Sequence, residues 1–398
     1  MKRDFIHTSE SVTEGHPDKV CDQISDAIID RFLEHDISAR VIAECAVSLS
    51  VVFIAARFAS DVKVDFPNVA RKVIGRIGYV DHEFSFKTCS ILTSLKDMAP
   101  DENRFLDENN MSEEGIDRLV AFDQVTLFGF ACNQSPTLLP LPIWLAHKLA
   151  KKLSEVRLQN ALPYLAPDGT TQVGVEYENR VPRRIHSITI NTSQKDRTYP
   201  KPERLQDDIR EAVIEAVFQD EPIPPDNGTT VFINPGGPLK LGGPSVHSGL
   251  TGRKNAIDTY GGYARNSGSA LSGKDPWRID RVGAYAARYA AKNVVAAGLA
   301  DQCEVQLSYT IGMAGPVSVQ VETMGTGKIS DDDISALVEK HFDFRLGGIV
   351  KKFDLRRLPS KSKDGFYRKL AAYGHFGRAD MELPWEMTDK ATVLRSAW

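Results

Sequence analysis

The chain has 398 residues, more than one hydrophobic core usually organises, so two or three domains are expected. Hydrophobic residues make up 42% of the chain and charged residues 26%, which excludes the disordered and fibrous classes of protein. The net charge of -4 excludes a general binder of nucleic acids or anionic membranes, so any basic site must be a local pocket.

The five cysteines are scattered along the chain and never spaced as CxxC. This spacing excludes a zinc ribbon and offers no disulfide framework, so we expect buried thiols in a reducing compartment. No apolar run follows the charged N-terminal residues, and the most apolar stretch, 138–146, is short and interrupted by Pro140 and Pro142. These features predict a cytoplasmic protein without a membrane span.

The first predicted helix opens at Gly15-His16-Pro17, because proline suits a first helical position. A buried apolar stripe then recurs every fourth residue from Val20 to Phe32. Two strands are predicted over 41–49 and 51–56, followed by a helix over 65–77 that ends at Gly78.

Two further units repeat this order of two strands followed by one helix. Their predicted elements are strands over 173–177 and 185–191 with a helix over 203–218, and strands over 304–311 and 317–322 with a helix over 331–342, capped by Ser330. Three such units predict an α/β (α+β) fold of three similar strand–strand–helix subdomains around a pseudo-threefold axis.

Two segments of biased composition mark the expected domain boundaries. One is the polar stretch 100–117, and the other is the Pro/Gly-rich stretch 222–249. We therefore expect an N-terminal subdomain over 1–113, a central one over 114–235 and a C-terminal one over 236–398. The stretch 100–117 is long for a connection inside a compact domain, so we expect either a mobile lid or disorder there.

Aspartates recur every fourth residue from Asp18 to Asp30 along the first predicted helix. We expect Asp26 and Asp30 to lie on a solvated helix face. Asp18 differs because it stands in the first turn beside His16. A carboxylate at a glycine turn suits Mg2+, and an adjacent histidine can stabilise an oxygen that gains charge. A purely structural turn explains this short motif equally well.

The stretch 242–280 is the strongest candidate for a binding site. It interleaves glycines with cations, as in Gly249-Leu250-Thr251-Gly252-Arg253-Lys254 and Ser272-Gly273-Lys274. Glycines let the backbone approach a ligand, and the cations suit phosphates, although neither the GxxxxGK[ST] nor the GxGxxG spacing is present. The stretch predicts a phosphate cradle, with a glycine-rich hairpin as the alternative. Asp280 opens an alanine-rich helix and suits a second metal-binding carboxylate or a helix cap.

These motifs together resemble the S-adenosylmethionine synthetase (methionine adenosyltransferase) family almost from end to end. The motifs that carry the resemblance are Gly-His-Pro-Asp-Lys at 15–19, Gly-Leu-Thr-Gly-Arg-Lys at 249–254, Asp-Thr-Tyr-Gly-Gly at 258–262, Ser-Gly-Lys-Asp-Pro at 272–276 and Leu-Pro-Trp-Glu at 383–386. The resemblance implies three α/β subdomains and active sites between two subunits, hence a homodimer or homotetramer. It implies attack of the methionine sulfur on C5′ of ATP, with release of triphosphate and its hydrolysis to phosphate and pyrophosphate.

The resemblance also implies roles for individual residues. His16 stabilises the departing oxygen, Asp18 and Asp280 bind Mg2+, and Glu44 lies at a K+ site. The residues implied in ATP binding are His16, Asp168, Arg253, Lys254, Lys274 and Asp280, of which His16, Arg253, Lys254 and Lys274 are also implied in catalysis.

The chain departs from the family pattern mainly at the second-substrate pocket, where it carries Arg57, Met98, Asp123, His247 and Arg278. Arg57 replaces a glutamate that contacts methionine, and Asp123 survives in a hexapeptide, 120–125, that has lost its three glycines. Two further replacements change contacts that the family pattern implies with ATP: Thr170 replaces a lysine, and Leu239 replaces an aromatic residue that stacks on adenine. The metal and phosphate positions are largely intact, which favours an active enzyme.

Methionine is the default second substrate on family grounds. The altered pocket favours weak use of methionine and adenosyl transfer to a different small nucleophile, because replacing Glu by Arg at position 57 repels an ammonium group. Arg57 turned toward the triphosphate, in place of the missing lysine, is the competing interpretation. A non-catalytic ATP-binding partner of a true synthetase and an ATP hydrolase are the remaining alternatives.

Overall fold

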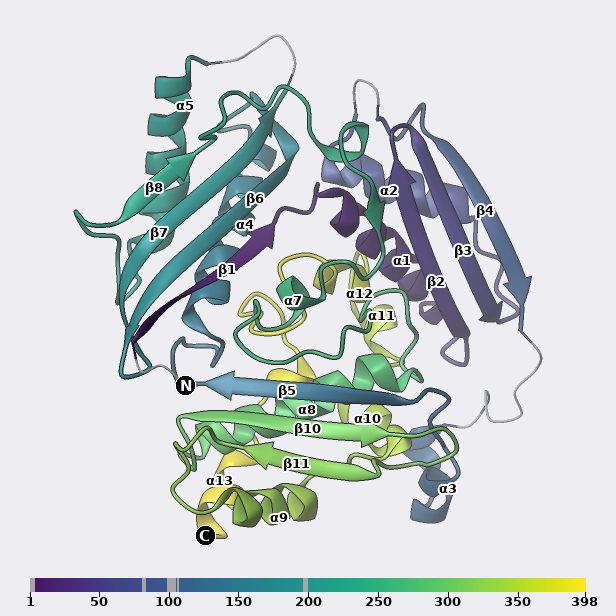
Figure 1. The fold of residues 1–398 in the computed structure, drawn as a ribbon. Coiled ribbons are helices and arrows are strands. Elements are labelled where there is room, and N and C mark those ends of the chain that lie inside the picture. The colour runs from purple at the N-terminus through teal and green to yellow at the C-terminus, as the bar shows by residue number, and fades with distance from the viewer. Residues whose placement is uncertain (1–3, 81–83, 99–104, 106, 196–199) are drawn as a thin grey trace.

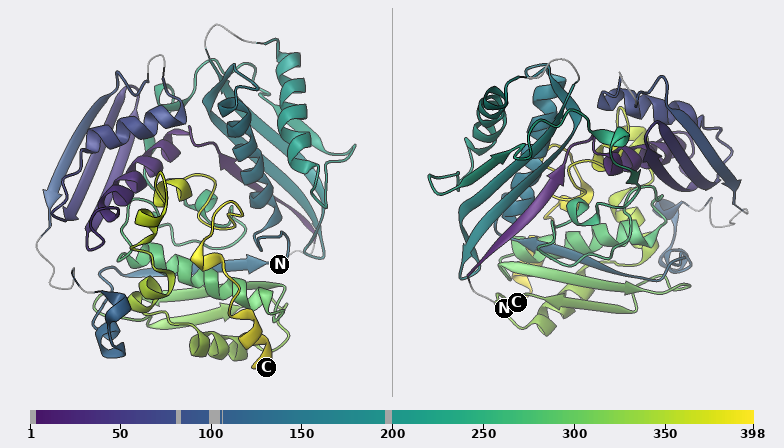
Figure 2. Two further views of the ribbon diagram at one scale, coloured as in Figure 1. Left: turned by 180° about the vertical axis from the view of Figure 1, so that it is seen from behind. Right: turned by 45° about the horizontal axis from the view of Figure 1, so that its top comes forward.

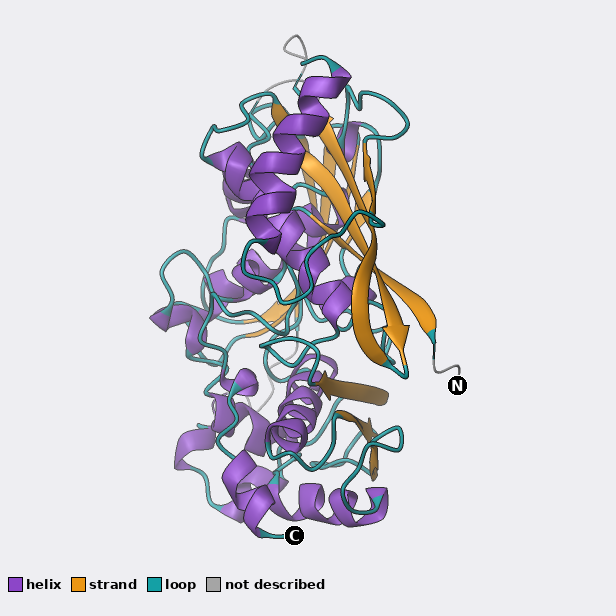
Figure 3. Ribbon diagram, turned by 90° about the vertical axis from the view of Figure 1, so that its left-hand side faces the viewer, coloured by secondary structure: helices purple, strands orange, loops and turns teal. Residues whose placement is uncertain are grey.

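Three β-sheets lie at the corners of a triangle in the computed structural model (Figure 1). The structure describes residues 4–80, 84–98, 105, 107–195 and 200–398. Seen from behind, long helices lie in front of the sheets (Figure 2), and the side view shows helices on one side and strands on the other in its upper part (Figure 3). The α+β fold of three strand-and-helix units predicted from the sequence is confirmed.

The first sheet has the strand order β4-β3-β2-β9. Its strands are β2 (Arg40–Ser48), β3 (Val51–Ala59), β4 (Ser90–Asp97) and β9 (Gly249–Leu250), covered on one face by α1 (Pro17–Leu33) and α2 (Phe66–Ile77). Inward side chains alternate with outward ones along β2 and β3, as expected of a sheet with one covered face. The predicted ends of α2 are correct: Asp65 accepts the Asn68 N–H at 3.0 Å, and Gly78 ends the helix with a φ of 104°.

The second sheet has the order β1-β6-β7-β8. Its strands are β1 (Phe5–Val12), β6 (Leu165–Glu178), β7 (Val181–Gln194) and β8 (Thr230–Ile233), and it packs against α4 (Leu141–Leu158). The predicted helix over 203–218 is present as α5 (Pro202–Ile209), a π-helical turn over 210–215 and α6 (Ala216–Phe218). A separate cluster of buried apolar side chains lies beneath this sheet.

The third sheet has the order β11-β10-β5. Its strands are β5 (Val125–Cys132), β10 (Gln302–Tyr309) and β11 (Ser318–Glu322), with α8 (Ile279–Ala296), α9 (Asp331–His341) and α10 (Leu346–Phe353) packed nearby. The alanine-rich α8 approaches β5 closely, since a Cβ at Gly129 would meet the Ala287 backbone at 2.0 Å. Ser330 caps α9 by accepting the Asp333 N–H at 3.1 Å, as predicted.

Short helices fill the connections between these elements. They are α3 (Glu113–Asp117), α7 (Asn255–Asp258), α11 (Leu358–Lys361), α12 (Tyr367–Leu370) and α13 (Ala391–Ser396), with 3-10 turns at Glu108–Asn110, Gly243–Ser245 and Pro384–Glu386. None of the helices in the described ranges combines the length and apolar character needed to cross a lipid bilayer. All five cysteines are buried and unpaired, as expected.

The three sheets exchange strands between distant parts of the chain. β1 joins β6, β5 joins β10, and β9 joins β2, so each sheet uses a strand from outside its own main span. The division at 1–113, 114–235 and 236–398 stays a prediction. The lid expected over 100–117 falls partly outside the described residues, at 100–104 and 106, while the remainder includes α3.

The solvated face expected for Asp26 and Asp30 is wrong, because these residues are 0% and 3% exposed. α1 lies at the centre of the molecule, and every residue of it except Arg31 is buried. Asp26 accepts two bonds from the Arg281 guanidinium, at 2.7 and 3.0 Å. Asp30 accepts the backbone N–H groups of Tyr367 and Arg368 at 2.8 and 2.9 Å. The helix is buried on both faces, so its carboxylates have protein partners in place of water.

Candidate active site

His16 stands at the N-terminus of α1 and is the cap residue of that helix. Its Nδ1 accepts the backbone N–H of Asp18 at 3.2 Å, so the neutral ring carries its proton on Nε2. Burial, and then the charge of Lys254, lowers the pKa of His16 to about 4. The imidazole is therefore neutral near pH 7 and presents an Nε2–H donor.

The Asp18 carboxylate is contacted by several groups of the first glycine loop. It is buried, and its Oδ1 accepts the backbone N–H of Leu250 at 3.0 Å. Arg253 Nε lies 3.5 Å from Asp18 Oδ1, and Lys254 Nζ lies 3.3 Å from Asp18 Oδ2. A cavity of about 320 Å³ opens here, lined by His16, Asp18, His247, Ser248, Arg253 and Lys254. The structure thus gathers five of the predicted site residues around one space.

The first glycine loop is fastened to β2 and to the start of α1. Gly249 pairs with Val47 in the sheet, and Thr251 exchanges backbone and side-chain bonds of 2.9 Å with Cys45. A Cβ at Gly249 would lie 2.2 Å from the carbonyl oxygen of Pro17, so only glycine permits this approach. The loop therefore holds Arg253 and Lys254 beside His16, at the N-terminus of α1.

The second glycine loop is fastened to the same strand and helix. The Gly273 N–H donates to Asp26 at 2.8 Å, and its carbonyl accepts the Ala43 N–H at 2.8 Å. Gly273 has a φ of 78°, and a Cβ there would lie 2.1 Å from the Ala43 oxygen. Lys274 then extends to Asp280, with Nζ 3.2 Å from Oδ1. Both cation-bearing loops are thus held by α1 and β2.

The residue set around these loops fits a polyanion that arrives with a hard metal ion. Within the described ranges, no three His, Cys, Asp or Glu side chains gather as a metal-binding group. Mg2+ usually takes only one or two carboxylates and completes its shell with water and substrate phosphates. Asp18 and Asp280 each present a carboxylate beside a lysine of a glycine loop, so the donor set suits such an ion.

Asp168 approaches the site from β6. Its Oδ2 accepts the Gly243 N–H at 2.7 Å, while its Oδ1 is buried and has no hydrogen-bond partner among the described residues. Burial raises the pKa of Asp168, and the nearby His247 opposes that shift. An unsatisfied buried carboxylate oxygen next to the site is consistent with a role as ligand acceptor.

The predicted second-substrate residues fall in separate places. Met98 and Arg278 line a cavity of about 180 Å³ with Phe122 and Trp277, and Arg278 Nη1 lies 3.2 Å from Asp123 Oδ2. His247 instead lines the His16 cavity. The structure therefore does not bring all five residues together within one chain.

Arg57 and Glu44 lie on the outer face of the first sheet, and both are exposed. Large apolar side chains share that exposure, including Val51, Phe53 and Leu250. Glu44 has no cluster of acidic or histidine neighbours in the described part of the chain. A single chain thus leaves an apolar face uncovered beside two of the predicted site residues.

Three positioning residues were missed by sequence reasoning. The Asp22 carboxylate accepts the Gly252 N–H at 2.8 Å and binds the fully buried Lys19 at 3.0 Å, and Arg281 binds both Asp26 and the Lys274 carbonyl. The available signal was the aspartate column itself, because it lies on the helix face opposite the apolar stripe of a helix that has no exposed face. The loop glycines that bind these aspartates lie more than 200 residues away in sequence, so no local pattern predicts the contacts.

The fold and this site define a class: a three-sheet α+β protein whose two glycine loops bring cations beside the carboxylates of Asp18 and Asp280. Models of the S-adenosylmethionine synthetase N-terminal, central and C-terminal domains match residues 4–100, 118–239 and 241–387. The chain is 48% identical to the S-adenosylmethionine synthase of Microcystis aeruginosa, over 100% of this chain and 99% of that protein. It is also 48% identical to that of Synechococcus elongatus, over 99% and 98% of the two chains.

The chain belongs to the S-adenosylmethionine synthetase family. The matches span all three sheets and both glycine loops, so the resemblance inferred from the motifs is confirmed.

Proposed function

We propose that the chain is an ATP-dependent methionine adenosyltransferase. A lone pair of the methionine sulfur forms a bond to C5′ of ATP, and the C5′–O bond breaks with its electron pair leaving on triphosphate. Water then cleaves triphosphate to phosphate and pyrophosphate. The observation that carries this proposal is the neutral Nε2–H donor of His16, which shares one cavity with Arg253 and Lys254.

Each residue has a separate task in this reaction. The leaving oxygen gains negative charge as C5′–O stretches, and His16 Nε2–H donates to it. Arg253, Lys254 and Lys274 bind the triphosphate and offset its growing charge, while their loops stay fixed on α1 and β2. Because donors and cations are held before the reaction, little reorganisation opposes the transition state.

Mg2+ and K+ are the proposed cofactors. Asp18 and Asp280 would hold Mg2+, which supplies further neutralisation of the phosphates, and Glu44 would lie at a K+ site. Asp168 would contribute to ATP binding through its Oδ1, which has no hydrogen-bond partner in the described ranges.

The alternatives are not favoured by the relatives. Proteins that match this chain over nearly their whole length are named S-adenosylmethionine synthase, which supports methionine as the second substrate. Adenosyl transfer to a different nucleophile and a regulatory ATP-binding role therefore rank second, and they rest only on the replaced pocket residues such as Arg57.

A homodimer or a dimer of dimers is the proposed assembly, in the cytoplasm. The exposed apolar face of the first sheet supports it, because Val51, Phe53 and Leu250 lie beside the exposed Arg57 and Glu44. A second copy on that face would cover the apolar residues and bring these two side chains to a shared site. Sedimentation velocity combined with activity measurement tests this, and a catalytically active monomer contradicts it.

The decisive experiment incubates purified protein with Mg2+, K+ and ATP, with and without methionine, and identifies products by mass spectrometry. We expect S-adenosylmethionine with phosphate and pyrophosphate. Free adenosine, a different adenosyl adduct or no product would each reject methionine adenosyl transfer in favour of one named alternative.

A further inference from the structure

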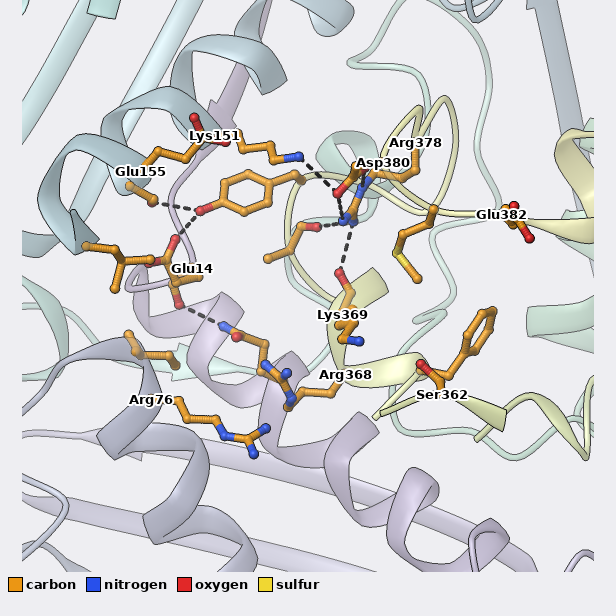
Figure 4. A pocket seen from close by; sticks show the side chains of 18 of the residues that line it. Glu14, Arg76, Lys151, Glu155, Ser362, Arg368, Lys369, Arg378, Asp380 and Glu382 are labelled. Carbon is orange, nitrogen blue, oxygen red and sulfur yellow. Dashed lines mark hydrogen bonds and ion pairs between the residues drawn. The ribbon is translucent and has the colours of Figure 1, made fainter. Parts of the chain in front are cut away.

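A cavity of about 870 Å³ lies apart from the candidate active site and shares no lining residue with the His16 cavity. Residues from helices in different parts of the fold line it, including α1, α2, α4 and α12, and the close-up shows the labelled side chains around it (Figure 4). Its space far exceeds one water molecule and falls within the range of small-molecule sites.

Among the described residues, two of the cations that line this cavity have no acidic partner for their side chains. Arg76, Lys151, Lys361 and Arg378 each pair with an aspartate. Arg368 and Lys369 have no carboxylate within ion-pair distance in the described ranges.

Arg368 has an unsatisfied hydrogen-bond donor among the described residues. Its Nη2 donates to the Asp364 carbonyl at 2.9 Å, but its Nε is buried without any hydrogen-bond partner among the described residues. A buried N–H of a charged group that lacks an acceptor is costly, so such groups normally have a partner or a ligand. Within the described part of the chain, Lys369 Nζ donates to the Lys363 carbonyl at 2.6 Å and to no other group.

Arg76 adds a second guanidinium next to Arg368, as the labelled side chains in Figure 4 show. Burial, followed by the Arg76 charge, lowers the pKa of Arg368, while the carboxylates of Asp30 and Asp364 oppose the shift. Among the described residues Arg76 pairs with the carboxylate of Asp364, and that pair is half-exposed and therefore weak. Together these groups form a basic patch with capacity for one added acid group.

The rest of the lining limits what the ligand can be. Apolar side chains contribute to the walls, namely Ile77, Leu158, Leu358, Phe366 and Met381. Glu155 and Glu382 also line the cavity and have no ion-pair partner in the described ranges, and Figure 4 shows them on opposite sides of it. A polyanion that filled the cavity would meet these carboxylates, whereas a ligand with one acid group and an apolar body would not.

We propose that this cavity is a second ligand site, which binds an organic anion. The acid group of the ligand lies on Arg368, Arg76 and Lys369, where it accepts the bond that Arg368 Nε lacks. The apolar body lies against the walls that include Phe366 and Met381.

Isothermal titration of the full chain with phenyl phosphate, and separately with inorganic phosphate, tests this proposal. We expect one phenyl phosphate site per chain, with phosphate alone binding at least about tenfold more weakly because it lacks the apolar body. Equal affinities for the two probes, or no phenyl phosphate binding at millimolar concentration, would overturn the proposal.

Three variants locate the probe. Arg368→Gln should weaken phenyl phosphate binding by roughly tenfold or more, since it removes a charge-assisted hydrogen bond. Lys369→Gln should weaken it as well. The Lys369 side chain donates to one exposed carbonyl among the described residues, so this variant provides a second measurement if Arg368→Gln folds poorly. Arg253→Gln, in the candidate active site, should leave the affinity unchanged. Loss in Arg253→Gln with no change in the other two would assign the probe to the active site and refute a second site.

Discussion

Asp18 and Asp26 lie on the same face of α1, eight residues apart, and both accept a backbone N–H from a glycine loop. Their charge partners differ. Asp26 binds a fully buried guanidinium through two bonds, whereas Asp18 faces a cavity and two partly exposed cations, Arg253 and Lys254. The difference teaches that spacing and residue type do not separate a structural carboxylate from a ligand-binding one. The two kinds of carboxylate differ in whether their cation partner is buried, as for Asp26, or reaches solvent, as for Asp18.

The strongest test of this contrast is Asp26→Asn. The Asn side chain can still accept the Gly273 N–H, but Arg281 keeps a buried positive charge without a counter-charge. Breaking a buried ion pair in this way costs about 3–5 kcal/mol of stability. Urea unfolding monitored by circular dichroism measures this loss.

Asp18→Asn is the matched control, because its cation partners reach solvent and need less compensation. We expect a clearly smaller loss of unfolding free energy there. Equal losses in the two variants would remove the distinction between the ends of the column.

Turnover should depend on the residues at the cavity end of α1. His16→Asn removes the Nε2–H donor from the leaving oxygen, and we expect a rate about 100- to 1000-fold lower, or about 3–4 kcal/mol of barrier. ATP should still bind, because the cations of both loops remain in place. Asp18→Asn should lower metal-dependent turnover, because it removes a carboxylate that would hold Mg2+. Stopped assays at saturating substrate measure the rate, and an unchanged rate in both variants would exclude these residues from the mechanism.

Asp30 provides a test through pH. Burial raises the pKa of Asp30 to about 7 from the ordinary 3.8, although the N–H bonds from Arg368 and Tyr367 oppose the shift. Because the folded pKa is the higher one, the contribution of Asp30 to stability is fully present below about pH 4 and is lost as pH rises to 7. The slope approaches 1.4 kcal/mol per pH unit.

Asp30→Asn should abolish that slope. The unfolding free energy of the variant relative to the unmodified protein should therefore rise between pH 4.5 and 7, as measured by urea titrations at several pH values. A constant difference across this range would mean that Asp30 does not titrate in the fold.

The smallest effect concerns Arg57 on the outer face of β3. Arg57→Glu changes the local charge by two units and should attract the methionine ammonium, so we expect KM for methionine to fall about tenfold, near 1.4 kcal/mol, with kcat unchanged. Lys72→Glu, an exposed position on α2, controls for overall charge. Reduced ATP turnover in Arg57→Glu would instead place Arg57 on the triphosphate.

Local patterns in the sequence predicted most elements well. Asp65, Gly78 and Ser330 mark helix ends through caps that depend only on nearby residues, and the structure places them as expected. The strand exchange between sheets was not predictable, because β1, β5 and β9 pair with segments far away in sequence. The motifs predicted several of the cations and carboxylates that the structure gathers around one cavity. The burial of Asp26 depends on Arg281, whose identity as a partner has no local signature.

The long reach of the α1 carboxylates has a consequence for synthesis on the ribosome. Their partners follow 232 residues later for Asp18, 247 for Asp26 and 337 for Asp30. At roughly 5–20 residues per second, the partners of Asp30 emerge about 17–70 seconds after it. During that interval the Asp30 carboxylate lacks both backbone N–H groups that it accepts in the fold, so water hydrates it, although Lys19 is already present on the same helix to pair with Asp22. The central helix is therefore among the first segments made and among the last to be enclosed.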